Sequence, residues 1–457
     1  MNLRSALRIQ PGESIAFSGS GGKTTALFTL ARQLDDPVVA TTTTHFSKQQ
    51  VAFADHVIYA TDFGNIPEFA KLIKLGINML IGEEVEEKRV SGVPEHLLPE
   101  IHQYSKKNGI NLLIEADGSR QRALKAPASH EPVIPPFIDL AVVVAGLSAL
   151  GKPLTSQFVH RINRFAALAG LNEGDEITPE AIIQVLTSDM GGLKGIPEDA
   201  RRVCLVNQAD DEQLQALGNR LAGSLLPAYD SVIVASLSKI HETRDQETIL
   251  DAPQYGNGIF GVHEPVVGII LAAGGSSRMG RPKQLLPWQG ETLIRHVTST
   301  VIEAGLDNIV VVVGASEEQV RPELIDLPVE IVVNPIWESG QSTSVQAGLS
   351  AIPENSGAAI FFLMDQPEVS RTLIRTMIER HAATLAPIVA PIADGQRGNP
   401  VLFDCSTFSD FGSIRGDTGG RELFSRFPVS WIEWHNPAVL SDIDTDDDYQ
   451  RLISGST

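Results

Sequence analysis

The stretch Val266–Pro287 has the sequence VVGIILAAGGSSRMGRPKQLLP. A short apolar run passes directly into a loop that contains Gly274, Gly275 and Gly280. An apolar strand followed by a glycine-rich turn is typical of open α/β sheets, which bind ligands at the carboxyl ends of their strands. Because glycine has no Cβ, such a loop can bring backbone N–H groups close to phosphates. The stretch therefore predicts a phosphate-binding loop in an α/β domain.

On either side of this stretch, short β-branched runs alternate with amphipathic helical stretches, as in parallel sheets covered by helices. At 457 residues the chain exceeds what one core usually supports, so we expect two α/β domains, 1–250 and 266–457. The segment 251–265 collects Pro, Gly and Asn without a period and is the expected linker. The predicted strands are 13–17, 38–42, 56–60, 78–81, 112–117, 140–145, 203–207 and 231–235, then 266–271, 308–313, 329–333 and 358–364, and helices are predicted over 293–304 and 343–351.

Composition limits the partners of the chain. It is 42% hydrophobic and 20% charged, and no apolar run approaches the ~18 residues of a membrane span. The formal net charge of −20, with no cluster of Lys and Arg along the sequence, argues against binding DNA or RNA. The N-terminus lacks the features of a secretory signal, and Cys204 and Cys405 lie far apart. We therefore expect a cytoplasmic protein that binds neither membrane nor nucleic acid.

Charged residues near the glycine loop suggest phosphate and metal chemistry. Arg278 can grip two phosphate oxygens, and Lys283 can neutralise charge at the α-phosphate. Asp365 follows the apolar run AAIFFLM at the carboxyl end of a predicted buried strand, which makes it the first candidate for Mg²⁺. Asp442 and Asp444 are further candidates, although the cap of a helix accounts for them about equally well. The neighbouring acidic run at 446–448 fits the first turn of a helix better.

Six blocks, LAAGGSSRMGRPKQLLP, NPIWESGQSTSVQAGL, MDQP, GNPVLF, GDTGGR and DIDTDDDY, occur in that order over 266–455. In this the chain resembles the molybdenum cofactor cytidylyltransferases, a branch of the MobA-like nucleotidyltransferases. The resemblance implies a Rossmann-like nucleotidyltransferase domain that uses Mg²⁺ and transfers CMP from CTP to molybdopterin, with pyrophosphate leaving. LAAG favours CTP over GTP, whereas Asn399 departs from the GHPVLF of many relatives and weakens the acceptor contacts carried over there.

Carried over residue by residue, the resemblance assigns catalytic or phosphate roles to Arg278, Lys283 and Asp365. The block GDTGGR is typical of a turn that enters a helix, so we expect Asp417 near the cap and Arg421 in contact with the anionic acceptor. The nucleotide-contacting residues that it implies are Leu271, Ala272, Ala273, Gly274, Gly275 and Ser342, and Asn334, Ser339, Gln341 and Ser344 would line the central pocket beside Ser342. Two alternatives stay open. One is a non-catalytic carrier or insertion chaperone for the cofactor, and the other is a transferase for another phosphorylated acceptor.

The first domain contains its own phosphate-loop signature, ESIAFSGSGGKTTALFTLARQL over 13–34. A strand, a glycine-rich turn and a helix with Gly22-Lys23-Thr24 predict a P-loop NTPase-like domain binding ATP or GTP. Phe17 stands where the standard spacing has glycine, so the shorter GSGGKTT is more similar to the GTNGKTT loop of the Mur ligases. Lys23 would reach the phosphates and Thr24 would ligate Mg²⁺. The predicted loop residues are Gly19, Gly21, Gly22, Lys23, Thr24 and Thr25.

Further polar residues follow the other predicted strands of this domain. The run Thr41–Thr44 with His45 could face a γ-phosphate, Glu115 and Asp117 stand where a Walker B acid would, and Asn207 with Asp210 is spaced like a base-reading motif. These blocks, together with Arg122 and Lys125, resemble the YqeC-like accessory proteins of selenium-dependent molybdenum hydroxylases over about 10–240. The resemblance implies a nucleotide-dependent step in cofactor maturation, with an apo molybdenum hydroxylase as a possible partner.

Overall fold

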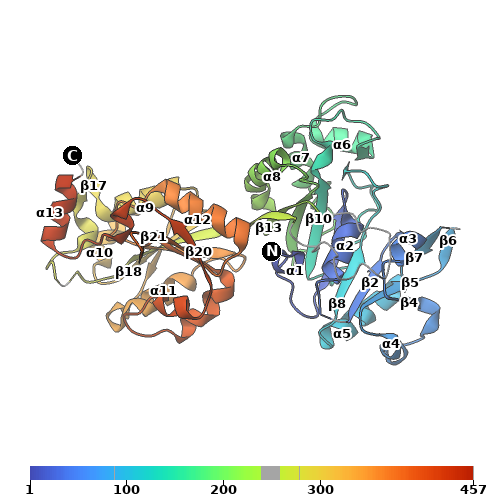
Figure 1. Cartoon of the computed structure of the whole chain (residues 1–457), viewed down its shortest axis with the longest axis horizontal. Helices are drawn as coiled ribbons and strands as arrows, with labels where there is room; N and C mark the ends of the chain where they lie inside the picture. The colour runs from blue at the N-terminus through green and yellow to red at the C-terminus, as the bar shows by residue number, and fades with distance from the viewer. Residues whose placement is uncertain (36, 87, 238–257, 277, 456–457) are drawn as a thin grey trace. The chain divides into compact units, whose positions relative to one another are not determined.

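The computed structural model describes residues 1–35, 37–86, 88–237, 258–276 and 278–455. The chain forms two compact α/β units, Met1–His263 and Glu264–Thr457, each built on one large sheet (Figure 1). In the part of the chain that is described, no helix is both long and apolar enough to cross a membrane. The two-domain α/β organisation predicted from the sequence is confirmed.

The N-terminal unit contains a nine-stranded sheet in the order β14-β13-β12-β10-β1-β8-β2-β5-β4. Its strands are β1 (Ser14–Gly19), β2 (Val38–Thr42), β4 (His56–Tyr59), β5 (Ile77–Ile81), β8 (Asn111–Glu115), β10 (Leu140–Gly146), β12 (Arg201–Asn207), β13 (Ser231–Ala235) and β14 (Ile259–His263). Only the β13–β14 pair of this sheet is antiparallel. Every residue of β10 is buried, as expected for a central parallel strand covered on both faces.

The other elements of this unit surround the large sheet (Figure 1). The helices are α1 (Leu3–Ala6), α2 (Lys23–Ala31), α3 (Lys48–Val51), α4 (Ile66–Leu72), α5 (Leu98–Lys107), α6 (Ile162–Ala169), α7 (Pro179–Leu186) and α8 (Glu212–Leu225). Two small sheets are formed by β3 (His45–Ser47) with β7 (Arg89–Ser91) and β6 (Glu84–Glu86), and by β9 (Leu124–Lys125) with β11 (Val159–His160).

The segment predicted as a linker contains a strand. Residues 251–257 lie outside the described residues, but Ile259–His263 form β14, which pairs with β13 and buries Val262. A Cβ at Gly261 would lie 2.4 Å from Asn219 Oδ1, so this glycine allows α8 to approach the edge strand closely. Gly261, one of the residues that suggested a loop, thus belongs to a strand, and the N-terminal unit extends to His263.

The C-terminal unit contains an eight-stranded sheet in the order β19-β18-β15-β20-β23-β21-β22, with β24 beside β21. These strands are β15 (Val266–Ala272), β18 (Asn308–Val313), β19 (Glu330–Val333), β20 (Ala358–Leu363), β21 (Ile388–Ala393), β22 (Gln396–Arg397), β23 (Val401–Asp404) and β24 (Val429–Glu433). The sheet is mixed, because β23 runs antiparallel to both β20 and β21. This corrects the expectation of a purely parallel sheet, since no strand had been predicted beyond residue 364.

Helices cover both faces of the second sheet. The helices are α9 (Leu293–Glu303), α10 (Glu317–Val320), α11 (Gln341–Leu349), α12 (Arg371–Thr384) and α13 (Asp446–Gly455), and a small hairpin of β16 (Pro287–Trp288) and β17 (Glu291–Thr292) precedes α9. One core joins α9, α12 and α13 to strand residues such as Ile270, and the other joins α11 to residues such as Ile269. Alternate residues of β15 therefore enter opposite cores, as the two-residue period of a strand requires.

Candidate active site and phosphate loop

The glycine loop of the C-terminal unit begins at the carboxyl end of β15, between β18 and β20. Leu271 and Ala272 are the last residues of β15, and Gly274 and Gly275 in the loop are exposed to solvent. Gln284, which the sequence analysis did not select, is buried and donates from Nε2 to the carbonyl oxygens of Ala272 at 2.8 Å and Gly274 at 3.0 Å. Its side chain therefore fixes the curvature of the loop. The only signal in the sequence was that the amide residue Gln284 directly precedes two apolar residues, Leu285 and Leu286.

Lys283 brings the two main acidic candidates together. Its Nζ lies 2.7 Å from Asp444 Oδ1 and 3.4 Å from Asp365 Oδ2, and only 11% of its side chain is exposed. Its backbone N–H donates to Ser276 Oγ at 3.0 Å, which ties the lysine to the glycine loop. Residues 161 positions apart in sequence thus meet at the carboxyl edge of β15 and β20. Asp444 Oδ2 also accepts from Arg278 at 3.0 Å, so Arg278 belongs to the same group.

The two carboxylates have different electrostatic environments. Burial raises the pKa of Asp365, the positive charge of Lys283 opposes this increase, and the negative charge of Asp442 adds to it. The hydrogen bond from Lys283 lowers the pKa of Asp444, whose side chain is 48% exposed. The positive charge of Lys283 thus favours the ionised form of Asp365, and a cation bound beside this carboxylate would act in the same direction.

The donor set suits a hard divalent cation. Asp365 and Asp444 offer carboxylate oxygens on either side of an ammonium group, so positive charge already lies between them. Asp442 is exposed and accepts from Gln366 Nε2 instead of Lys283. Within the described ranges, no three His, Cys, Asp or Glu side chains are grouped closely enough to hold a metal by themselves. A cation here would need further oxygen ligands, such as the phosphates of a nucleotide.

The turn into α11, which was predicted to line the central pocket, is held together by polar contacts. Asn334 is buried and donates from Nδ2 to Thr343 Oγ1 at 2.8 Å and Ser344 Oγ at 3.0 Å. The backbone N–H of Ser342 donates to the carbonyl of Gly416 at 3.0 Å. Gly340, with φ of 109°, lies against Gly416, where a Cβ would come within 2.3 Å of the backbone. Asn334 and Ser344 thus support the turn from within.

The other residues predicted near this turn have different outcomes. Gln341 is half-buried against Gly419, and Ser339 is exposed at the end of a short 3-10 helix, Trp337–Ser339. Asp417 and Arg421 are both exposed, and Gly419 occupies the N-cap of the 3-10 helix Gly420–Ser425. Asp417 is therefore not the cap that the sequence suggested. The acidic run at 446–448 does begin α13, as predicted.

Trp337 covers part of the glycine loop. A Cβ at Gly275 would lie 2.8 Å from the Trp337 ring, and one at Gly314 would lie 2.9 Å from it. The indole is half-buried. Two glycines are thus needed for the aromatic ring to lie close to the backbone of the loop, beside Ala273. The tryptophan is part of the block NPIWESGQ, but its position could not be derived from that block.

The phosphate loop of the N-terminal unit joins β1 to α2, as predicted. Gly19, Gly21 and Gly22 have φ values of 90°, 82° and 127°, which side chains rarely tolerate. A Cβ at Gly19 would lie 2.2 Å from the carbonyl oxygen of Val144, and one at Gly21 would lie 2.4 Å from the backbone N of Gly146. The loop is therefore packed against the end of β10, and its glycines are required by close backbone contacts.

Lys23 is at the centre of a buried charge network. Its Nζ donates to the carbonyl of Gly19 at 2.8 Å and lies 3.2 Å from Asp117 Oδ1. Lys125 contacts the other oxygen of Asp117 at 2.7 Å and Glu131 at 2.9 Å. Hydrogen bonds from Arg161 and Lys125, working against burial, lower the pKa of Glu131 to about 2. Asp117 and Lys125 were predicted near the loop, whereas Glu131 was not found because it lies in a proline-containing loop.

Thr24 contacts the other predicted acid of this unit. Its hydroxyl donates to Glu115 Oε2 at 2.7 Å and accepts from Gln50 Nε2 at 2.7 Å. Glu115 is buried, and burial raises its pKa. Thr24 and Glu115 are thus arranged like the hydroxyl and Walker B acid of a magnesium site. Thr25 lies beside them in the first turn of α2.

Several residues predicted near the phosphates have structural roles. Thr42 Oγ1 donates to the carbonyl of Glu115 at 2.7 Å, and His45 is exposed on β3. Asn207 donates to the carbonyl of Gly21 at 2.8 Å and accepts from the backbone N–H of Leu237 at 2.9 Å. The nitrogen and the oxygen of this side-chain amide are both hydrogen-bonded to the backbone, so Asn207 supports the loop. The hypothesis that it reads a base is not supported.

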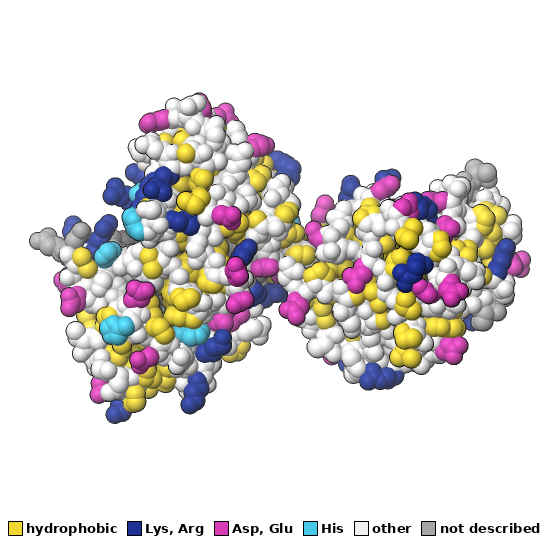
Figure 2. Space-filling model, turned by 180° about the vertical axis from the view of Figure 1, so that it is seen from behind, with side chains coloured by type: hydrophobic (Ala, Val, Ile, Leu, Met, Phe, Trp, Pro, Cys, Tyr) yellow, Lys and Arg dark blue, Asp and Glu magenta, His cyan; other side chains and the backbone are white. Residues whose placement is uncertain are grey.

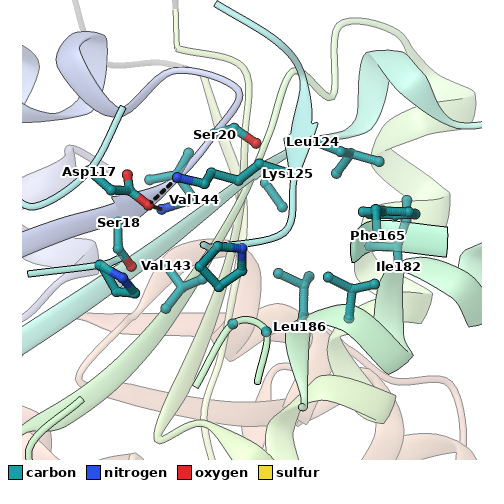
Figure 3. Close-up of a pocket in the computed structure, with 17 residues that line it drawn as sticks. Ser18, Ser20, Asp117, Leu124, Lys125, Val143, Val144, Phe165, Ile182 and Leu186 are labelled. Carbon is teal, nitrogen blue, oxygen red and sulfur yellow. Dashed lines mark hydrogen bonds and ion pairs between the residues drawn. The ribbon is translucent and has the colours of Figure 1, made fainter. Parts of the chain in front are cut away.

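A small cavity of about 30 Å³ lies behind the phosphate loop (Figure 3). Ser18, Ser20 and Lys125 line its polar side, and Phe165 and Leu186 are on its apolar side. This volume holds one or two water molecules and no nucleoside. A nucleotide on the phosphate loop must therefore lie outside this cavity.

Comparison with known proteins matches each unit separately. The family model described as MobA-like NTP transferase domain matches residues 268–431, and the model described as YqeC protein matches residues 15–163. The chain is 30% identical over 197 residues to the uncharacterized protein YqeC of Escherichia coli. The aligned residues cover 42% of this chain and 75% of that protein.

Two relatives share sequence over less than half of the chain. The nicotine blue oxidoreductase of Paenarthrobacter nicotinovorans is 31% identical over 198 residues, covering 41% of this chain and 96% of that protein. A probable molybdenum cofactor guanylyltransferase of Bacillus mycoides is 30% identical over 135 residues, covering 30% of this chain and 65% of that protein.

Proposed function

Because the chain belongs to the YqeC family through its N-terminal unit and to the MobA-like NTP transferase family through its C-terminal unit, we propose that it transfers CMP from CTP to molybdenum-loaded molybdopterin. The nucleotidyltransferase activity follows from the family, and CTP and the acceptor are the proposal. The observation that carries it is the meeting of Lys283, Asp365 and Asp444 beside the glycine loop. The molybdenum cofactor is supported by the guanylyltransferase relative and by the ordered sequence blocks.

The reaction needs no protein nucleophile. A terminal phosphate oxygen of molybdopterin attacks the α-phosphorus of CTP in line, a new P–O bond forms, and the bond to the β-phosphate oxygen breaks as pyrophosphate leaves. Lys283, released from Asp444, neutralises the charge that develops on the α-phosphate, and Arg278 holds the departing phosphates. Asp365 and Asp444 would hold Mg²⁺, which supplies positive charge to the triphosphate when bound.

The direct test is a transfer assay. The purified full-length chain is incubated with Mg²⁺, molybdenum-loaded molybdopterin and either CTP or GTP, while pyrophosphate release and the dinucleotide product are measured. Turnover with CTP and little with GTP is the expected result. Turnover with GTP but not with CTP would show that GTP is the substrate instead of CTP. Tight binding of the dinucleotide without turnover would favour a carrier. Pyrophosphate and the dinucleotide are both measured, because one relative of the chain is named an oxidoreductase and transfer must therefore be shown directly.

For the N-terminal unit the proposal is ATP or GTP binding at Gly19–Thr25, with Lys23 on the phosphates and Thr24 with Glu115 at Mg²⁺. It is supported by the glycine conformations and by the contact of Thr24 with Glu115. Equilibrium binding of a labelled ATP or GTP analogue to the full chain tests it, with Lys23→Met expected to abolish one of two binding events. The proposed N-terminal site would be contradicted if all nucleotide binding is retained in Lys23→Met and lost in Lys283→Met.

A role in delivering cofactor to an apo molybdenum hydroxylase is the accompanying proposal, and it rests on the resemblance of the sequence blocks in about 10–240 to the YqeC-like accessory proteins. The test is to incubate a purified apo-hydroxylase with the full chain carrying the dinucleotide product, or with free dinucleotide, and to measure hydroxylase activity over time. Transfer of cofactor to the hydroxylase is the expected result, and activation at the same rate by free dinucleotide would contradict it.

A further inference from the structure

An open pocket of about 540 Å³ in the N-terminal unit is lined by basic residues from two short segments, 120–122 and 156–164. The lining residues are Arg120, Arg122, Ser156, Val159, His160, Arg161, Ile162, Asn163 and Arg164, and none of them is acidic. This composition is unexpected in a chain with 56 acidic and 36 basic residues. The sequence showed no cluster of Lys and Arg, so this basic pocket is produced by folding. Figure 2 shows Lys and Arg side chains gathered beside His on one face of this unit.

The small sheet of β9 and β11 assembles the pocket. Its parallel pairing aligns Leu124 with Val159 and so brings 120–122 next to 159–164. Arg120 and Gln121 have φ values of 51° and 58°, and Arg161 has φ of 65°. Such left-handed conformations are strained for residues other than glycine, Asn and Asp, and they persist only where the surrounding structure imposes them. The pocket is therefore built on defined backbone conformations.

Most of the positive charge in this pocket is not neutralised. Arg161 is paired with Glu131, and Arg164 Nη1 donates to the carbonyl of Pro127 at 3.3 Å. Among the described residues, the guanidinium groups of Arg120 and Arg122 have neither a hydrogen bond nor an ion pair. The first turn of α6, which includes Arg164, also lines the pocket, so the positive end of the helix dipole adds to the charge. Placing these cations together is unfavourable unless an anion binds between them.

We propose that this basic pocket binds a small phosphate-bearing ligand with at least two negative charges. Guanidinium groups bind phosphate oxygens in pairs, and the concave shape suits a compact molecule better than a polymer. The pocket adjoins the phosphate loop, because the backbone N–H of Gly21 donates to the carbonyl of Arg122 at 3.0 Å. The ligand would therefore lie next to the nucleotide of the N-terminal unit. The proposal is independent of the cytidylyl-transfer reaction proposed for the C-terminal unit.

Calorimetric titration of the full chain with inorganic pyrophosphate, at low salt and without Mg²⁺, tests the basic pocket. Two glycine loops can also bind pyrophosphate, so each site is removed in turn. Arg122→Gln with Arg164→Gln is expected to weaken one binding event by at least about tenfold, since a charged hydrogen bond contributes roughly 1.5–3 kcal/mol. Lys23→Met and Lys283→Met are expected to retain that event. Arg220→Gln, an exposed residue on α8 that does not line the pocket, is the matched control.

The outcomes separate clearly. Loss of the event only in the double arginine variant, with the same melting temperature as the parent chain, supports the proposal. Pyrophosphate binding unchanged in that variant, or lost only in Lys23→Met, would overturn it. A competing titration with citrate tests the chemical class, because citrate binding as tight as that of pyrophosphate would contradict a phosphate site.

Discussion

At the scale of single residues, Lys283 connects the glycine loop to both acidic candidates. The sequence predicted Lys283, Arg278, Asp365 and Asp444 individually, from residue type and position after strands. It could not predict that Lys283 lies between the two carboxylates, because that contact depends on the path of the chain through β20 and α13. Gln284 and Glu131 were not predicted for the same reason, since their partners are backbone atoms or side chains brought near by folding.

Replacing Lys283 by Met is expected to lower the rate of nucleotidyl transfer by at least about 100-fold, because positive charge is lost where negative charge develops on the α-phosphate. It should also raise the pKa of Asp365 further, since the lysine is the positive group that opposes the effect of burial. Pyrophosphate release as a function of pH measures both effects. Arg371→Met, which removes an exposed charge paired with Glu303, is the control, and transfer equal to that of the parent chain in Lys283→Met would refute the assignment.

Asn207→Ala tests the role of this residue as a support of the phosphate loop. The carbonyl of Gly21 and the N–H of Leu237 would lose their partners, so unfolding of the N-terminal unit should become easier by about 1–3 kcal/mol. Nucleotide affinity should fall for ATP and GTP by the same factor. Denaturant unfolding and analogue binding measure these quantities, and a change in the preference between ATP and GTP would indicate base recognition instead.

At the scale of elements, the sequence predicted every strand of the two large sheets except β14, β21, β22, β23 and β24. The buried strands β2, β13 and β18 have the predicted bounds, because uninterrupted apolar runs mark a strand covered on both faces. β23 is only four residues long, and the runs of β14, β21 and β24 are interrupted. β14 contains Gly261, β21 contains Pro391, and the exposed residues of β24 interrupt its apolar pattern. Elements whose environment is set by distant packing carry a weak local signal.

His263, at the end of β14, should make the N-terminal unit sensitive to acid. Its Nε2 is 2.8 Å from Asn219 Oδ1, and burial lowers its pKa from 6.5 to about 4. The unfolded chain therefore binds a proton below pH 6.5 that the folded unit does not bind until about pH 4, so stability falls as the pH falls through this interval.

The measurement is the free energy of unfolding at pH 7 and pH 5. In His263→Gln, which can retain a donor to Asn219, the loss between these pH values should be smaller by on the order of 2 kcal/mol. His96→Gln serves as a control for a general effect of removing a histidine. An equal loss of stability in the parent chain and in His263→Gln would contradict the prediction.

At the scale of the whole molecule, β14 places the boundary of the N-terminal unit at His263. A chain of residues 1–263 should therefore be more stable than the chain 1–250 suggested by sequence. Burial of Val262 alone contributes about 1.5–3 kcal/mol, which predicts a melting temperature higher by at least about 3 °C. Calorimetry of the two purified fragments measures the difference, and equal melting temperatures would show that β14 adds no stability.

The tryptophan beside the glycine loop has a practical consequence. An indole that lies against Gly275 and Gly314 is an intrinsic fluorophore at the place where the proposed nucleotide would bind. Its emission should respond to occupancy in the unmodified chain, without a dye or a coupled enzyme. A Trp337→Phe variant would isolate that signal from the three other tryptophans, so ligand association at the C-terminal unit could be followed in real time by stopped flow.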